Sequence, residues 1–122
     1  MTDGFDSWFK RAAHQIESLM AVTNLAQNAL ISGMAAVREA VEVIGSTATD
    51  GQRWLSSNPC PDRELGDRFG RLFERYSALA TGFEEGCHGQ GRECLPALAQ
   101  EVGALSGDLT DFIADVQKRL GG

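Results

Sequence analysis

The chain has 122 residues, of which 43% are hydrophobic and 23% charged, and its formal net charge is −6. This composition is typical of a globular chain of one-domain size and argues against disorder, so we expect residues 1–122 to form a single helical domain. The negative charge argues against general nucleic-acid binding, which needs a basic face to neutralise phosphates.

The N-terminal stretch, MTDGFDSWFKRAAHQ, has acidic residues where a secretory signal peptide carries positive charge, and no apolar segment follows. No apolar run approaches the roughly 18 residues that a transmembrane helix needs. We therefore expect a cytoplasmic protein without a transmembrane segment. Arginine outnumbers lysine by nine to two, which is typical of a bacterial genome rich in G and C.

Residues 5–44 carry an apolar seam in alternating steps of three and four, the period of one helix face. No proline interrupts the seam, so it predicts one long helix of about 40 residues, running roughly 60 Å. The glycines of GSTATDGQ, residues 45–52, then indicate a turn or frayed joint. A short helical turn is expected over about 49–57.

The long seam predicts self-association, because two shorter helices cannot cover all of it. One solution is a break near Thr23–Asn28 or at Gly33, which would give a monomeric four-helix bundle. The other pairs the first helix with a second chain or with another helical protein. We favour a homodimer, because no proline and no Gly-Ser cluster lies within residues 5–44. The predicted interface consists of Phe9, Ile16, Leu19, Met20, Leu30, Met34, Val37, Val41 and Ile44.

Two prolines in NPCPD, residues 58–62, predict a firm break, since proline removes a backbone donor and disfavours helix in the preceding residue. Asp62 is placed to cap a second helix over about 62–85. A third helix is expected over about 95–120, with proline in its first turn. The predicted fold class is an all-α helical bundle whose last two helices form an antiparallel hairpin.

Charges beside the two seams predict the register of this hairpin. Arg68 and Arg75 flank the second helix, and Asp108 and Asp115 flank the third. In an antiparallel pair joined by a short loop, Arg75 should meet Asp108 and Arg68 should meet Asp115.

The segment EEGCHGQGREC, residues 84–94, has the ligand types of a metal site. Cys60, Cys87, His88 and Cys94 would form a Cys3His zinc set, but the helix over 62–85 separates Cys60 from the others by roughly 36 Å. We therefore expect no metal. A disulfide between Cys87 and Cys94 requires an oxidising compartment. It stays an alternative to our interpretation of this segment as a plain helix–helix joint.

Catalytic patterns are weak. His14 and Glu17 are spaced i,i+3, but in reverse order to the Glu-x-x-His motif of di-iron bundles and without a second set. The glycine-rich segment follows a helix, whereas a phosphate-binding loop follows a strand. We expect no enzyme, no cofactor and no metal. Core or interface positions are expected for the aromatic residues Phe5, Trp8, Phe9 and Trp54, with a binding patch or membrane contact as the alternative.

These observations predict a non-enzymatic helical bundle that acts through protein–protein interaction or self-assembly. The first helix resembles the amphipathic helices of phasins, and this resemblance implies a coat protein on a hydrophobic granule or lipid surface. A helical pocket for an apolar small molecule, lined by Met20, Met34 and phenylalanines, is a further alternative.

Overall fold

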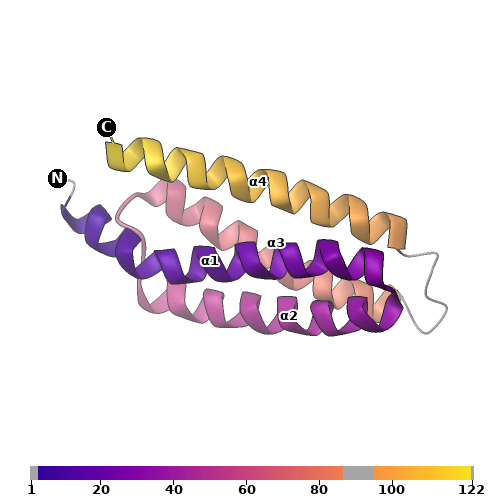
Figure 1. Ribbon diagram of the computed structural model, residues 1–122. Helices are drawn as coiled ribbons and strands as arrows, with labels where there is room; N and C mark the ends of the chain where they lie inside the picture. Colours follow the sequence, from indigo (N-terminus) through magenta and orange to yellow (C-terminus); the bar gives the residue numbers. More distant parts are fainter. Residues whose placement is uncertain (1–2, 87–94, 122) are drawn as a thin grey trace.

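An antiparallel bundle of four helices forms over residues 3–86 and 95–121, the residues that the computed structural model describes (Figure 1). Each helix runs opposite to the one before it, so that α1 begins and α4 ends at the same end of the bundle. Helix contacts run around the bundle, since α1 and α3 each pack against both α2 and α4. The predicted all-α bundle is confirmed. Its helices are α1 (Asp3–Ser32), α2 (Met34–Ser57), α3 (Arg63–Gly86) and α4 (Leu95–Gly121).

The single helix predicted over residues 5–44 is wrong, because Gly33 divides it into α1 and α2. Gly33 has φ 131° and ψ 177°, a backbone region that is essentially restricted to glycine. Its N–H still donates to the carbonyl of Ala29 (3.0 Å), and its carbonyl accepts the N–H of Val37 (3.0 Å). One residue thus ends α1 and starts α2. The apolar seam folds back on itself within one chain.

The turn predicted in residues 45–52 is also wrong, because α2 continues without a break to Ser57. Packing against α3 explains these glycines. A Cβ on Gly51 would overlap the ring of Phe73, and a Cβ on Gly45 would lie 3.4 Å from that of Ala80. Small residues here bring α2 close to α3, so the glycines mark a helix contact. The helical turn predicted over 49–57 is the last part of α2.

The break predicted at residues 58–62 is confirmed, and α3 begins at Arg63. The Asp62 carboxylate accepts a hydrogen bond from the Leu65 N–H (3.1 Å), as expected of an N-cap. Asp62 also forms an ion pair with Arg119 of α4 (3.1 Å). Both α3 and α4 agree with the predicted ranges to within one residue at each end.

Aromatic side chains fill the core near the α2–α3 connection. Trp8 is 1% exposed, and its indole N–H donates to the carbonyl of Asn58 (2.7 Å). Its ring lies 5.8 Å from that of Trp54 and 5.9 Å from that of Phe69, centroid to centroid. Phe69 stacks on Phe112 of α4 at 5.0 Å. These contacts join all four helices. The aromatic residues expected in a core are buried or partly buried: Phe5, Trp8, Phe9 and Trp54.

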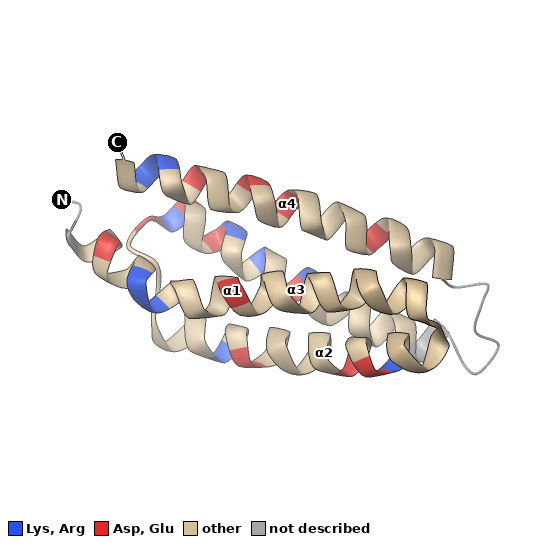
Figure 2. Ribbon diagram, in the orientation of Figure 1, with Lys and Arg blue, Asp and Glu red and all other residues tan. Residues whose placement is uncertain are grey.

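Ion pairs along the α3–α4 contact confirm the predicted register. Arg68 Nη1 lies 2.5 Å from Asp115 Oδ2, and Arg75 Nη1 pairs with Asp108. Arg75 also lies 3.5 Å from Glu101. Figure 2 shows blue and red residues interspersed along the four helices. Because these pairs are partly exposed, they select the register more than they stabilise the fold.

Candidate interaction surface

Most of the predicted interface residues contact other helices of the same chain. Four of them are at most 2% exposed, and Ile16 is 5% exposed. Met20 is the exception, with 48% of its surface exposed. The seam that motivated the first-helix dimer is therefore largely covered within the monomer. Buried residues of the set are Ile16, Leu19, Val37, Val41 and Ile44, and the partly buried ones are Phe9, Leu30 and Met34.

Cys87, His88 and Cys94, which belong to the cysteine segment, lie outside the described residues. The helix–helix joint stays a prediction, with a disulfide between Cys87 and Cys94 as its alternative. Cys60 is partly exposed in the α2–α3 connection, and burial is the main cause that raises the pKa of its thiol. Residues 3–86 and 95–121 contain no group of three His, Cys, Asp or Glu side chains that could hold a metal ion.

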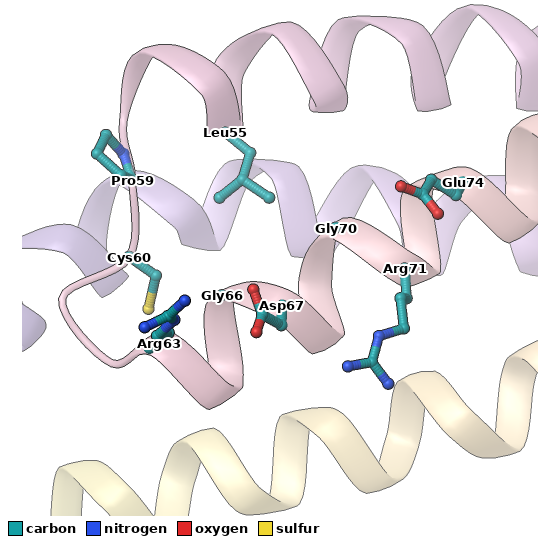
Figure 3. Close-up of a pocket in the computed structure, with 9 residues that line it drawn as sticks. All are labelled: Leu55, Pro59, Cys60, Arg63, Gly66, Asp67, Gly70, Arg71 and Glu74. Carbon is teal, nitrogen blue, oxygen red and sulfur yellow. The ribbon is translucent and has the colours of Figure 1, made fainter.

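An open groove of about 740 Å3 lies between the end of α2 and the outer face of α3 (Figure 3). Leu55 borders it from α2, and Pro59 and Cys60 border it from the connection. The close-up shows the remaining lining residues on successive turns of α3. We call this feature the α2–α3 groove. Its α3 residues are Arg63, Gly66, Asp67, Gly70, Arg71 and Glu74.

Two glycines one turn apart form the floor of the groove, but for different reasons. A Cβ on Gly66 would lie only 2.9 Å from the Cβ of Cys60, so the α2–α3 connection requires a glycine there. A Cβ on Gly70 would lie 3.6 Å from Leu55 Cδ2, an ordinary van der Waals distance. No contact among the described residues requires glycine at position 70, although glycine weakens a helix interior.

Four exposed charged residues line the groove in alternating sign: Arg63, Asp67, Arg71 and Glu74. Within the described part of the chain, none of the four forms an ion pair, whereas Arg68 and Arg75 on the α4 side of α3 are both paired. Arg71 also borders a hollow between α3 and α4, which Asp108 and Asp111 line from α4. The groove therefore offers charges of both signs to an external partner.

A second hollow, of about 650 Å3, lies where the α1–α2 junction meets the start of α4. Ile31 borders it with 87% of its surface exposed, and Leu30, Met34 and Leu95 add further apolar surface. Three other large apolar side chains among the described residues are exposed, which is common on protein surfaces. They are Met20, Leu25 and Val43.

The gap found at the centre of the core, among residues 3–86 and 95–121, has no space for a ligand. A small gap between Thr23, Ile44, Tyr76 and Leu105 is too narrow for a water-sized probe. Met20 points outward and Met34 lies at the end of the bundle, so the two do not line a common pocket with the buried phenylalanines. The proposed small-molecule alternative has no support from this geometry.

The arrangement defines an up-down-up-down four-helix bundle with an open, charged groove on its surface. No protein-family model, curated protein or solved structure matches the chain. Among residues 3–86 and 95–121, no helix is long and apolar enough to cross a membrane.

Our reading of the sequence missed the α2–α3 groove, although part of the signal is present. Gly66 and Gly70 are four residues apart, and so are Arg63, Asp67 and Arg71, which places both sets on neighbouring stripes of one helix. The contribution of Leu55 depends on α2 continuing beyond residue 45, where we predicted a turn.

Proposed function

We propose that this protein acts without catalysis, by binding another protein in the α2–α3 groove. The make-up of the groove carries this proposal, because a glycine floor lies between Leu55 and a row of charges that form no ion pair with any described residue. Apolar small molecules prefer enclosed, mostly apolar cavities. An open groove with charges of both signs is better suited to a helix or a peptide segment.

The chemistry of the groove supports a non-catalytic role. Cys60 is the nucleophile among the lining residues, and burial raises the pKa of its thiol, which keeps it protonated near neutral pH. No histidine lines the groove to activate the thiol. Among the described residues, every buried side-chain nitrogen or oxygen has a hydrogen-bond partner within the chain.

The phasin-like coat function stays an alternative, but it requires the bundle to open. The amphipathic helices bury their apolar faces against one another, and a granule surface would have to replace those contacts. Purified protein added to oil droplets or polyester particles distinguishes the two functions. A protein interaction module should stay in the aqueous phase as a cooperatively folded bundle, whereas a coat protein should move to the particles.

Two matched variants test the groove itself. Gly70→Arg fills the groove, and the ordinary distance to Leu55 leaves space for the new Cβ. Gly82→Arg places the same side chain on the same helix outside the groove, where no atom lies within 4 Å of a new Cβ. Both changes remove a glycine from a helix interior, so circular dichroism should show that both variants keep the bundle.

Tagged wild type and both variants then serve as baits in cells that naturally make the protein. We expect wild type and Gly82→Arg to bind the same partner, and Gly70→Arg to bind it at least about tenfold more weakly. A partner that both variants bind as well as wild type does would refute the groove as the binding surface.

A further inference from the structure

We propose that the α2–α3 groove binds a second copy of this chain, with α3 packed antiparallel on α3 of the other copy about a two-fold axis. This inference rests on the proposed function and specifies its partner. A two-fold interface uses the same patch on both copies, so the patch must be complementary to itself. The charges of α3 meet this requirement, and Gly70 leaves space for the contact.

The charge order along the groove is positive, negative, positive, negative, at Arg63, Asp67, Arg71 and Glu74. Antiparallel pairing centred near residues 68–69 places Arg63 opposite Glu74 of the second copy, and Asp67 opposite its Arg71. The two-fold axis repeats both pairs. A parallel arrangement in register would instead place each charge opposite its own copy, which is repulsive. The pattern therefore favours an antiparallel copy.

Gly70 lies beside this register and leaves room in the groove, because the nearest atom to a Cβ there would be Leu55 Cδ2 at 3.6 Å. Gly66 faces Cys60 of its own chain and is not open to a close approach. Distance between packed helix axes depends on the side chains at the contact, and a glycine allows a short one. This contact supplies a reason for the glycine at position 70, which no contact within the described residues requires.

Charge reversal tests this pairing. Asp67→Arg alone gives a chain with positive charges at both 67 and 71, and Arg71→Asp alone gives negative charges at both. In either homodimer these positions repel across the axis, so we expect association at least about tenfold weaker than in wild type. An equimolar mixture should form a heterodimer, because the positive pair of one chain faces the negative pair of the other. The double variant Asp67→Arg/Arg71→Asp should associate like wild type.

Sedimentation equilibrium between about 1 and 500 μM provides the readout, with the chain mass of 13.1 kDa as the monomer reference. Recovery on mixing also excludes misfolding as the cause of weak association in the single variants. Gly70→Arg should be monomeric and Gly82→Arg should match wild type.

Two outcomes would overturn the inference. Wild type could stay at the monomer mass throughout, or it could dimerise while the mixed variants fail to recover. If the inference fails but Gly70→Arg still loses a cellular partner that Gly82→Arg retains, the groove binds a different protein, and the proposed function stands. If neither self-association nor partner binding responds to Gly70→Arg, both proposals fail.

Discussion

The hydroxyl groups of Thr23 on α1 and Tyr76 on α3 share a hydrogen bond of 2.6 Å inside the core. Thr23 Oγ1 also lies 2.6 Å from the carbonyl oxygen of Leu19, to which only the threonine can donate. Tyr76 is therefore the donor to Thr23. This short chain of hydrogen bonds joins two helices that lie diagonally across the bundle, and it satisfies polar groups that are at most 5% exposed.

Removal of the Thr23 hydroxyl and removal of the Tyr76 hydroxyl should lower the free energy of unfolding by different amounts. Thr23→Val leaves the Tyr76 hydroxyl buried without its acceptor, at a cost of about 1–3 kcal/mol. Tyr76→Phe leaves Thr23 bonded to Leu19, so we expect a smaller loss of about 0.5–1.5 kcal/mol. Urea unfolding of both variants and of the double variant measures the coupling. A double variant whose loss equals the sum of the single losses would contradict this assignment.

The same site predicts a dependence on pH. Burial raises the pKa of Tyr76 in the folded protein, as the largest of several causes. Above the ordinary tyrosine pKa of about 10, the unfolded chain releases its phenolic proton first, so the free energy of unfolding falls as pH rises. Tyr76→Phe should remove this part of the decline. Unfolding midpoints of wild type and variant between about pH 8 and 11 should converge at the alkaline end, and parallel curves would contradict the prediction.

Substitution by alanine should lower the stability of the protein at Gly51 and raise it at Gly107. A Cβ on Gly51 overlaps the ring of Phe73, so Gly51→Ala should destabilise the protein by about 1–3 kcal/mol through overpacking. No atom lies within 4 Å of a new Cβ on Gly107, so Gly107→Ala should stabilise it by about 0.5–1 kcal/mol through helix propensity. Thermal unfolding of both variants compares them directly. A gain in stability for Gly51→Ala would show that α2 does not approach α3 as closely as described.

The two partners of the Arg68–Asp115 ion pair should contribute unequally to stability because Arg68 has a second contact. Its guanidinium carbon lies 5.7 Å from the centre of the Phe112 ring, within the range of a cation–π interaction. Arg68→Ala should therefore destabilise the protein more than Asp115→Ala. A double-mutant cycle for the pair should give about 0.2–1 kcal/mol, since both side chains are partly exposed. Equal losses from the two single variants would argue against the ring contact.

Local sequence patterns were sufficient to predict the structure where it depends on one helix face or on one pair of neighbouring helices. The seam positions from Phe69 to Val116 predicted the core of α3 and α4, and the charges at 68, 75, 108 and 115 predicted their register. Asp62 was recognisable as a cap because the prolines before it exclude a longer helix. Each of these inferences depends on residues that are close in sequence or on a single antiparallel pairing.

The path of the chain from α1 to α2 could not be predicted in the same way. Gly33 occupies a seam position, and nothing in the sequence distinguishes a glycine that turns the chain from one that packs within a helix. Gly45 and Gly51 show the reverse case, since they resemble turn residues but contact α3. The α2–α3 groove depends on both of these outcomes. Its composition was visible in the sequence, but its shape was not.

Gly33 provides the last prediction, because the backbone conformation of this one residue separates the compact bundle from the long helix. Gly33→Ala meets no steric obstacle, as no atom lies within 4 Å of the new Cβ, but its φ of 131° is strained for alanine. We expect the bundle to lose about 1–3 kcal/mol. Alanine also favours a continuous helix by about 1 kcal/mol over glycine. Merging α1 with α2 would expose the seam around Leu19 and Val41, which two chains could then bury by exchanging helices.

The Gly33→Ala protein should therefore show a larger fraction of particles at twice the chain mass of 13.1 kDa, measured by light scattering. Adding Gly70→Arg to it closes the α2–α3 groove, so any dimer that persists uses the exposed seam instead. Gly107→Ala in the same background serves as the control for a glycine replaced without backbone strain. A Gly33→Ala/Gly70→Arg protein that stays monomeric and as stable as Gly70→Arg alone would contradict the role assigned to this glycine.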